Sequence, residues 1–245
     1  SLKIMDTNKV EILISEICNM LKNSNAIGVG VLSPIPGAAS ILAKIEAKDE
    51  KRVIILGSEE APYAPESATE IFDIAGQGKL DSFFLSGGQI DGQANINLNY
   101  LTSKNQISKR WSGAFGSSFL YMVVPQIILF KLGHNTNSLV EKVDFVTAAG
   151  SSDTLTFRRG GADYLITDLC CFKFDRRKGI FKLKSIHPGN SLEEIKTKTG
   201  FIFDYSAQTD TTSAPDKIRQ KTIGEKVVPE LMKIYPKFAM TYWKN

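Results

Sequence analysis

A glycine-rich segment is the part of this sequence whose residue types point most directly to chemistry. It runs from Ser86 to Asn97, contains the pair Gly87 and Gly88, and directly follows the short apolar run 83–85. Consecutive glycines at the end of a strand let bare backbone approach a ligand and aim several N–H groups at one point. The segment therefore predicts a backbone site for an anion or an oxyanion.

Three other loops rich in small residues accompany it, at 32–37, 57–62 and 111–118. In an open parallel sheet, ligands bind at the carboxyl ends of the strands. The first two loops follow apolar strand patterns and the third precedes an apolar run, so together with 86–97 they predict a cleft with backbone donors on several sides. The alternative is that each loop is only a tight turn.

The elements that position these loops follow an α/β order. Helical spacing predicts an amphipathic helix over 7–23, and the turn 33–37 leads into a second helix that runs to Ala47. Short apolar strands at 27–31 and 53–56 flank the second helix. This strand, helix, strand order implies a parallel sheet with right-handed crossovers.

Later patterns enlarge the sheet and make it mixed. Strands are expected at 82–85, 126–130 and 143–147, and the runs 162–174 and 179–186 are typical of a β-hairpin. A helix capped by Ser191 and ended by Gly200, a polar loop over 205–215 and a last helix over about 215–234 complete the chain. We expect an α/β fold with an open, largely parallel mixed sheet flanked by helices, in one domain over 1–245.

Composition excludes several functional classes. The 245 residues are 42% hydrophobic and 23% charged, with a net charge of +4. The basic spots Lys51–Arg52, Arg158–Arg159 and Arg176–Lys178 stand without an aromatic and basic binding module, so nucleic acid is not expected as a partner, although the charges would steer an anionic ligand. No run approaches a membrane span and no leader pattern opens the chain, which favours a cytoplasmic protein without membrane contact.

Metal, thiol and dinucleotide chemistry are not indicated. Cys18, Cys170 and Cys171 lie in apolar patterns without ligand spacing and are expected in the core. His134 and His187 belong to no triad or metal spacing and are expected to be structural. The pair Gly28 and Gly30 lies inside a strand, lacks the third glycine of a dinucleotide fingerprint, and has no acidic residue at the end of the next strand.

Several of these segments together resemble a known family, the β subunits of class I coenzyme A transferases of the glutaconate CoA-transferase type. The resemblance runs in order from about residue 8 to 206 and covers strand 53–56, Leu85–Asn97, Arg110–Gly113, Val143–Thr147, Asp163–Asp168 and Asn190–Phe201. It implies a CoA-transferase (NagB/RpiA-like) fold and a homologous α subunit in a hetero-oligomer, for example α2β2. It also implies an acyl-CoA thioester as substrate, with no permanently bound cofactor and no metal.

The resemblance also implies roles for the loops. In the family a glutamate at a strand end attacks the acyl-CoA, forms a mixed anhydride and becomes a glutamyl-CoA thioester, while the Gly-Gly loop has an oxyanion-hole role. The residues placed on the oxyanion or CoA side are Ser86, Gly87, Gly88, Gln89 and Asn95. Those placed at the substrate pocket are Ser33, Pro34, Ser112, Gly113, Phe115 and Gly116. Tyr63, Trp111 and Phe115 would form an apolar wall, or Phe115 would plug the pocket.

The chain departs from the family at the nucleophile. Where the family has Glu, Ser and Gly after the strand, this sequence has Gly57, Ser58, Glu59 and Glu60. Three hypotheses follow: a divergent, hydrolase-like enzyme that takes its carboxylate from the α subunit; a true transferase with Glu59 or Glu60 as nucleophile; and a non-catalytic acyl-CoA-binding protein. A shift of two residues moves a side chain about 6–7 Å along a strand, so Glu59 reaches the family position only if the loop folds back.

Overall fold

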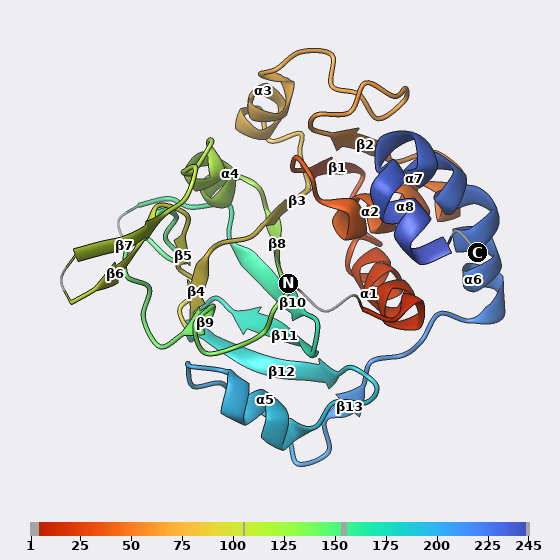
Figure 1. Cartoon of the computed structure of the whole chain (residues 1–245). Coiled ribbons are helices and arrows are strands. Elements are labelled where there is room, and N and C mark those ends of the chain that lie inside the picture. The colour runs from red at the N-terminus through yellow and green to blue at the C-terminus, as the bar shows by residue number, and fades with distance from the viewer. Residues whose placement is uncertain (1–4, 105, 153–155, 244–245) are drawn as a thin grey trace. The chain divides into compact units, whose positions relative to one another are not determined.

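The computed structural model describes residues 5–104, 106–152 and 156–243 (Figure 1). The chain separates into two compact units by its internal contacts. Unit 1 comprises the residues up to Phe84 together with those from Thr212 onward, and unit 2 comprises Leu85–Thr211. The prediction of a single domain stays a prediction, and each unit is described by itself.

Unit 1 is built on three parallel strands. β1 (Ala26–Val29) lies between β2 (Arg52–Ile55) and β3 (Ser82–Leu85), with Val29 opposite Ile55 and Ile27 opposite Ser82. These strands are almost continuously buried, as expected for a parallel sheet covered by helices. The helical segments of unit 1 are α1 (Thr7–Met20), α2 (Pro34–Glu46), α3 (Glu70–Gly76), α6 (Lys217–Thr222), the π-helical η1 (Ile223–Val227), α7 (Val228–Ile234) and α8 (Pro236–Trp243).

The C-terminal helices are tied to the N-terminal pair by one guanidinium group. Arg219 of α6 donates from Nε and Nη2 to the two carboxylate oxygens of Glu46, both at 2.7 Å. Its Nη1 also donates to Ser15 Oγ at 3.0 Å and to Asn19 Oδ1 at 2.7 Å on α1. Because this fork joins α1, α2 and α6, it fixes the end of the chain to its beginning.

Unit 2 contains a mixed five-stranded arrangement in the order β13-β12-β11-β10-β8. β10 runs parallel to β8, whereas β11 is antiparallel to both β10 and β12. The bounds are β8 (Gln126–Lys131), β10 (Ala162–Thr167), β11 (Cys170–Asp175), β12 (Ile180–Ile186) and β13 (Asp210–Thr211). The smaller elements are β4 (Gln89–Asp91), β5 (Ile96–Asn97), β6 (Tyr100–Ser103), β7 (Gln106–Arg110), α4 (Ser117–Val123), β9 (Leu139–Val140) and α5 (Leu192–Lys198).

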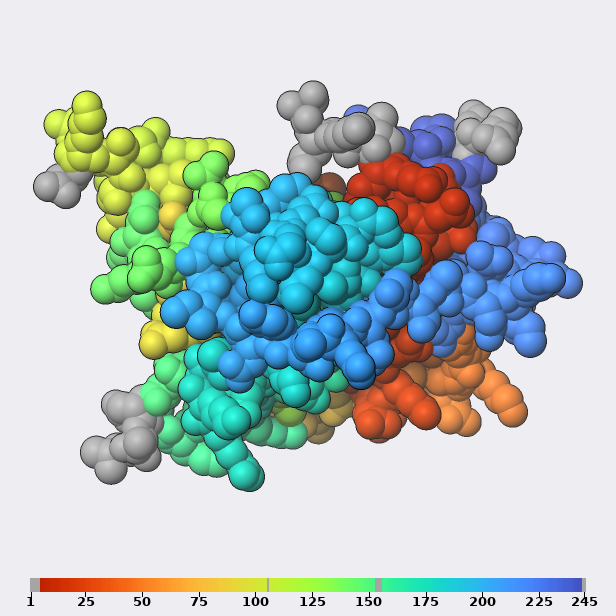
Figure 2. Space-filling view, turned by 90° about the horizontal axis from the view of Figure 1, so that it is seen from below, coloured from red at the N-terminus to blue at the C-terminus, as the bar shows by residue number. Residues whose placement is uncertain are grey.

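An aromatic cluster forms the core beside β11 and β12. Phe172 lies 5.9 Å from Phe181 and 5.1 Å from Phe203, and Phe181 stacks on Phe201 at 5.3 Å between ring centroids. Lys173 on β11 and Lys182 and Lys184 on β12 are exposed and alternate with buried residues, so one face of the hairpin is apolar and the other is polar. Figure 2 shows the surface that α5 and the neighbouring segments present, in blue at the centre of the view.

The α/β class and most of the elements expected from the sequence are confirmed, but some boundaries were wrong. Residues 143–147 do not form a strand, because the N–H groups of Val143 and Asp144 donate to the side chains of Asp91 and Gln89, and the Thr147 hydroxyl accepts from the Leu98 N–H. The run 162–174 is two strands separated by a turn at Asp168–Leu169. The last helix is divided into α6, η1 and α7, and Tyr235 separates α7 from α8.

Candidate functional site

The predicted site residues fall in both units. In unit 1, Gly57 lies two residues after Ile55, the end of β2, and has a φ of +80°, in the left-handed region. A Cβ on Gly57 would meet Val31 Cγ1 at 3.4 Å. Leu56 N–H donates to the Val29 carbonyl at 2.9 Å, so the loops after β1 and β2 adjoin at the carboxyl ends of their strands. This edge brings Gly57 and the 31–34 turn together, as the strand order predicts.

Glu59 and Glu60 lie in the loop after Gly57, and both are exposed. The Glu60 N–H donates to Ser58 Oγ at 3.1 Å, and the Glu60 carbonyl accepts from Tyr63 and Ala64. The backbone of the loop is therefore held, while both carboxylates point into a region open to solvent. Their assignment as nucleophiles stays a prediction.

The other predicted residues of unit 1 lie where α2 begins. Ser33 is half-buried and precedes Pro34, the first residue of the helix. The Ser33 side chain donates to the Val31 carbonyl at 3.4 Å and makes no capping bond to the helix.

Tyr63, predicted as part of an apolar wall, is 5% exposed, and burial raises its pKa to about 12. Its backbone carbonyl accepts from Ile55 of β2.

In unit 2 the two glycines of the Gly-Gly loop are required by close packing. A Cβ on Gly87 would come within 2.6 Å of Ile96 Cγ2, and one on Gly88 within 2.0 Å of the Trp111 ring. No other residue type fits without moving the backbone or the indole. The bare backbone predicted from the sequence is therefore present, and Trp111 lies directly against it.

A lysine holds this loop from the end of β8. Lys131 Nζ donates to the Gly87 carbonyl oxygen at 2.9 Å. Burial, together with the nearby Lys109 charge, lowers the pKa of Lys131. The Gly88 N–H donates to the Asn97 carbonyl at 2.9 Å, which leaves it engaged inside the loop. The orientation of the 87–88 peptide is thus set by one cation and one backbone bond.

Gln89 and Asn95, predicted on the CoA side, bond within the loop. Gln89 is 6% exposed, and its Oε1 accepts from Asn97 Nδ2 and from the Asp144 N–H, both at 2.9 Å. Asn95 Nδ2 donates to Asp91 Oδ2 at 3.1 Å. Both side chains therefore have a structural role in the segment 89–97, and their contact with CoA stays a prediction, as does that of the exposed Ser86.

The segment after Trp111 contains an unusual backbone. Gly113, Phe115 and Gly116 all have positive φ angles, of +95°, +38° and +75°, and the Phe115 side chain is 83% exposed. Ser112 is exposed, and Gly116 precedes the first residue of α4. These residues lie on one loop of unit 2, and both predicted roles of Phe115, as wall or as plug, stay open.

Sequence reasoning did not single out Lys131 or Asp91. Asp91 is 2% exposed, and its carboxylate accepts from the N–H groups of Gln93, Asn95 and Val143. Its position three residues after Gly88, among small polar residues, is the local signal that could have predicted a carboxylate that bonds to the backbone of its own loop. Lys131 carries no such local signal, because its partner is 44 residues away in the sequence.

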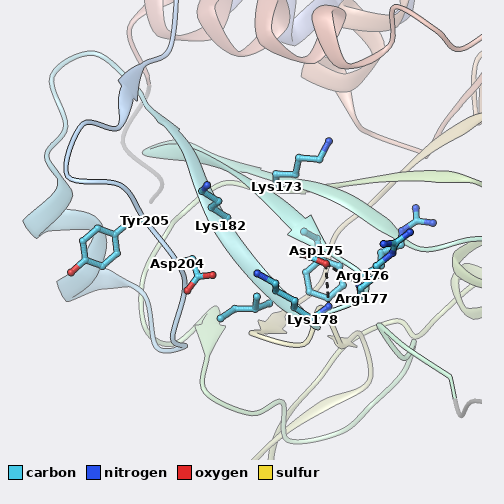
Figure 3. A pocket seen from close by; sticks show the side chains of 10 residues that line it. Lys173, Asp175, Arg176, Arg177, Lys178, Lys182, Asp204 and Tyr205 are labelled. Atoms are coloured by element: carbon cyan, nitrogen blue, oxygen red, sulfur yellow. Dashed lines mark hydrogen bonds between the residues drawn. The ribbon is translucent and has the colours of Figure 1, made fainter.

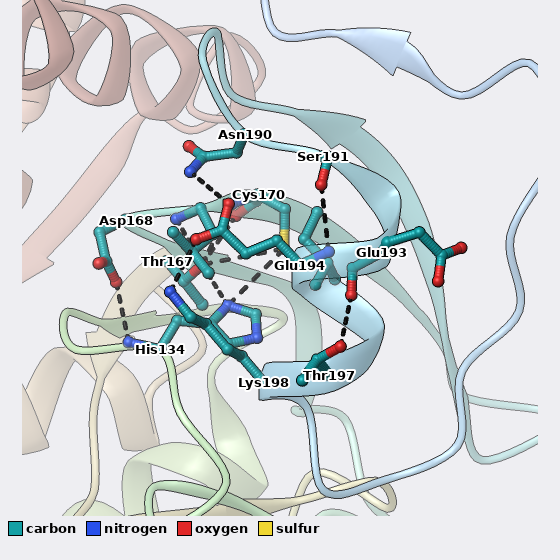
Figure 4. Close-up of polar contacts among 12 residues, drawn as sticks. His134, Thr167, Asp168, Cys170, Asn190, Ser191, Glu193, Glu194, Thr197 and Lys198 are labelled. Atoms are coloured by element: carbon teal, nitrogen blue, oxygen red, sulfur yellow. Dashed lines mark hydrogen bonds and ion pairs between the residues drawn. The ribbon is translucent and has the colours of Figure 1, made fainter.

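The histidines and cysteines have the structural positions expected of them. His134 is 4% exposed, with Nδ1 bonded to Thr167 Oγ1 and Nε2 to Thr199 Oγ1, each at 2.8 Å (Figure 4). Burial lowers the pKa of His134 to about 4, against the opposing charge of Asp168. Buried Cys170 lies 3.9 Å from His134 Nδ1, and burial raises the pKa of its thiol, so this pair is not an activated nucleophile.

Within residues 5–104, 106–152 and 156–243, no group of three or more His, Cys, Asp or Glu side chains is arranged to hold a metal ion. No helix in the same ranges is long and apolar enough to cross a membrane.

The chain is similar to known proteins of one family. Residues 12–198 match the family described as Coenzyme A transferase, and the chain belongs to this family. It is similar to the B subunits of two such enzymes. It is 25% identical to the B subunit of glutaconate CoA-transferase from Acidaminococcus fermentans, over 91% of this chain and 93% of that protein. It is 28% identical to the B subunit of 3-oxoadipate CoA-transferase from Pseudomonas knackmussii, over 60% of this chain and 58% of that one.

A solved structure agrees on the fold. The decarboxylase AibA/AibB superimposes on 94% of this chain and 95% of the matched chain, with a TM-score of 0.74 at 21% identity. The chain is therefore a member of the CoA-transferase family that is similar to its B subunits and has the family's α/β fold.

Proposed function

We propose that this chain is the β subunit of a CoA-transferase-like enzyme that acts on an acyl-CoA thioester, with hydrolase-like or otherwise divergent chemistry. The chain would supply the glycine loops and part of the acyl pocket. The reactive carboxylate would come from the partner subunit. Coenzyme A enters as part of the substrate, without a permanently bound cofactor.

The observation that carries this proposal is the backbone at Gly57. A side chain at a φ of +80° costs roughly 1–2 kcal/mol, and glycine avoids that cost. The position is therefore suited to glycine and unfavourable for a glutamate.

The unit 2 loop supports a role beside the thioester. Gly87 and Gly88 present bare backbone next to the Trp111 indole, and Lys131 places a positive charge beneath the loop. Because the Gly88 N–H already donates to the Asn97 carbonyl, we assign the stabilisation of developing negative charge to the Lys131 ammonium, a fixed charge that need not reorganise during the reaction. Ser112, Gly113, Phe115 and Gly116 would line the acyl side, where the exposed phenyl ring favours a bulkier group than a short diacid.

A homologous α subunit is the proposed partner, in a hetero-oligomer. The two similar sequences are both named as B subunits, and AibA/AibB is named as a pair. That protein is called a decarboxylase, so the fold also supports reactions other than transfer. This diversity supports a divergent reaction for the present chain.

A true transferase is the second candidate, because both similar B subunits are named CoA-transferases and Glu59 and Glu60 follow Gly57 in an exposed loop. The test uses the chain purified with its α subunit and measures CoA exchange and thioester hydrolysis. The proposal predicts hydrolysis or another acyl-CoA reaction that survives Glu59→Ala and Glu60→Ala, with Glu50→Ala as an exposed control. Loss of CoA exchange in either variant supports the transferase. If calorimetry detects no binding of CoA or acyl-CoA, the divergent enzyme and the transferase are both excluded. The chain would then be a non-catalytic protein.

A further inference from the structure

A basic hollow lies on the β11–β12 hairpin of unit 2. Its volume is about 710 Å³, and Figure 3 shows the charged side chains that surround it. Five cationic side chains and two carboxylates contribute to its lining. The residues are Lys173, Phe174, Asp175, Arg176, Arg177, Lys178, Ile180, Lys182, Asp204 and Tyr205.

Two of the lysines face each other across the strand pair. Lys173 of β11 is the register partner of Lys182 of β12, and both are exposed. Like charges directly opposite each other in an antiparallel pair are destabilising. Lys173 Nζ lies 5.1 Å from the Tyr164 ring, whereas Lys182 has no ion pair within the described ranges. A bound anion would relieve this repulsion.

The turn between the strands adds a second group of cations. The Asp175 carboxylate accepts the N–H groups of Arg177 and Lys178 at 3.0 and 3.1 Å, so it is already engaged in forming the turn. Arg176 is held by the carbonyls of Gly161 and Ala162. The Arg177 and Lys178 side chains are exposed beside the hollow. Asp204, the one remaining carboxylate in the lining, is the bridge partner of Lys182 and offsets part of the charge of that lysine.

The two groups are separated along one strand face. Lys182 and Ile180 are two residues apart on β12, about 7 Å in an extended strand, and the turn lies immediately before Ile180. An anion with several charges in a row would contact the lysine pair at one end and the turn at the other. A polyphosphate chain has this shape, with several oxygens that accept charge-assisted hydrogen bonds.

This hollow is separate from the loops of the proposed acyl-CoA site. Arg176 bonds to residues at the start of β10, whereas Lys131 and the Gly87 loop lie at the end of β8, which is parallel to β10. The six residues of β10 span about 20 Å. The hollow is therefore at the opposite end of these strands.

We propose that the hollow between Lys173, Lys182 and the Arg177–Lys178 turn binds a polyphosphate chain, either free or as part of a nucleoside triphosphate. The probes are inorganic tripolyphosphate and ATP, measured by calorimetry on the full chain with its partner, at low and at physiological ionic strength. Both probes are expected to bind once per chain, more weakly as salt rises. Equal affinity for tripolyphosphate and ATP indicates a site that contacts only the phosphates. Tighter binding of ATP indicates that the site also contacts the nucleoside.

The decisive variant is Lys173→Gln/Lys182→Gln, which should weaken tripolyphosphate binding roughly tenfold or more. Both lysines are exposed, so the fold should be retained, which the thermal midpoint checks. The matched control, Lys226→Gln/Lys237→Gln, removes the same charge from exposed positions of unit 1 and should leave the affinity within about twofold. Absence of saturable binding, or equal losses in both variants, would overturn the proposal.

Discussion

The indole of Trp111 lies directly against the backbone of Gly88, where a Cβ would approach its Cη2 and Cζ2 atoms to 2.0 Å. Overpacking of this kind costs typically about 1–3 kcal/mol. Gly88→Ala should therefore lower the thermal midpoint and weaken acyl-CoA binding, because either the loop or the indole must move. Gly88→Ala/Trp111→Leu makes room for the methyl group and should recover much of the stability.

Gly224→Ala is the control for this pair, since nothing lies within 4 Å of a Cβ at that position. Its thermal midpoint should match or exceed that of the parent chain. If Gly88→Ala is as stable as Gly224→Ala, the described contact between indole and loop is wrong.

The Lys131 ammonium should matter more for activity than for folding. Lys131→Met removes the bond to the Gly87 carbonyl and the charge beneath the loop. We expect about a tenfold loss of acyl-CoA turnover in the complex with its partner, mainly in kcat, because a fixed charge near the reacting group stabilises the transition state. Lys131→Arg should retain part of the activity. Lys142→Met, an exposed lysine in the same unit, is the control. An unchanged kcat in Lys131→Met would show that the Lys131 ammonium has no role in catalysis.

The guanidinium fork of Arg219 should stabilise the attachment of the C-terminal helices. Arg219→Gln loses two bonds to Glu46 and those to Ser15 and Asn19, and we expect a loss of about 1–2 kcal/mol in the free energy of unfolding. Lys221→Gln breaks only an exposed pair with Glu225 at 3.9 Å and should change little. Urea denaturation measures both. Equal stability of the two variants would contradict the role given to the fork.

Because of His134, the free energy of unfolding should decrease as the pH is lowered below 6.5. The unfolded chain binds a proton on this histidine near its ordinary pKa of 6.5, whereas the folded chain does so only near a pKa of about 4. Stability from the neutral, buried ring is therefore complete above pH 6.5 and is lost as pH falls toward 4, by about 3 kcal/mol in order of magnitude.

Denaturation curves between pH 7 and 4 measure this effect. His134→Gln should be less stable at pH 7, because the bonds to Thr167 and Thr199 change, and its stability should depend less on pH. A parent chain and variant with parallel pH profiles would exclude His134 as the titrating group.

Local patterns predicted the elements well and the polar connections poorly. The helices over residues 7–20 and 34–46 were predictable from local signals: apolar spacing in both, the Asp6 cap before the first and Pro34 at the start of the second. Segment 143–147 has strand-like residues, but its polar groups bond Gln89, Asp91 and Asn99, far away in the sequence. The bare backbone at Gly87 and Gly88 followed from residue type alone. The Trp111 contact and the Lys131 bond needed the tertiary structure, because no local rule relates residues so far apart.

The proposal that the reactive carboxylate lies outside this chain can be tested by chemical trapping of the covalent intermediate. The complex of this chain with its α subunit is incubated with acyl-CoA and treated with borohydride, which reduces a glutamyl-CoA thioester to an alcohol and releases CoA, and the reduced residue is mapped by mass spectrometry. We expect acyl-CoA turnover with no reduced glutamate in this chain. Reduction of Glu59 or Glu60 to the alcohol would contradict this expectation and assign the nucleophile to the loop after Gly57.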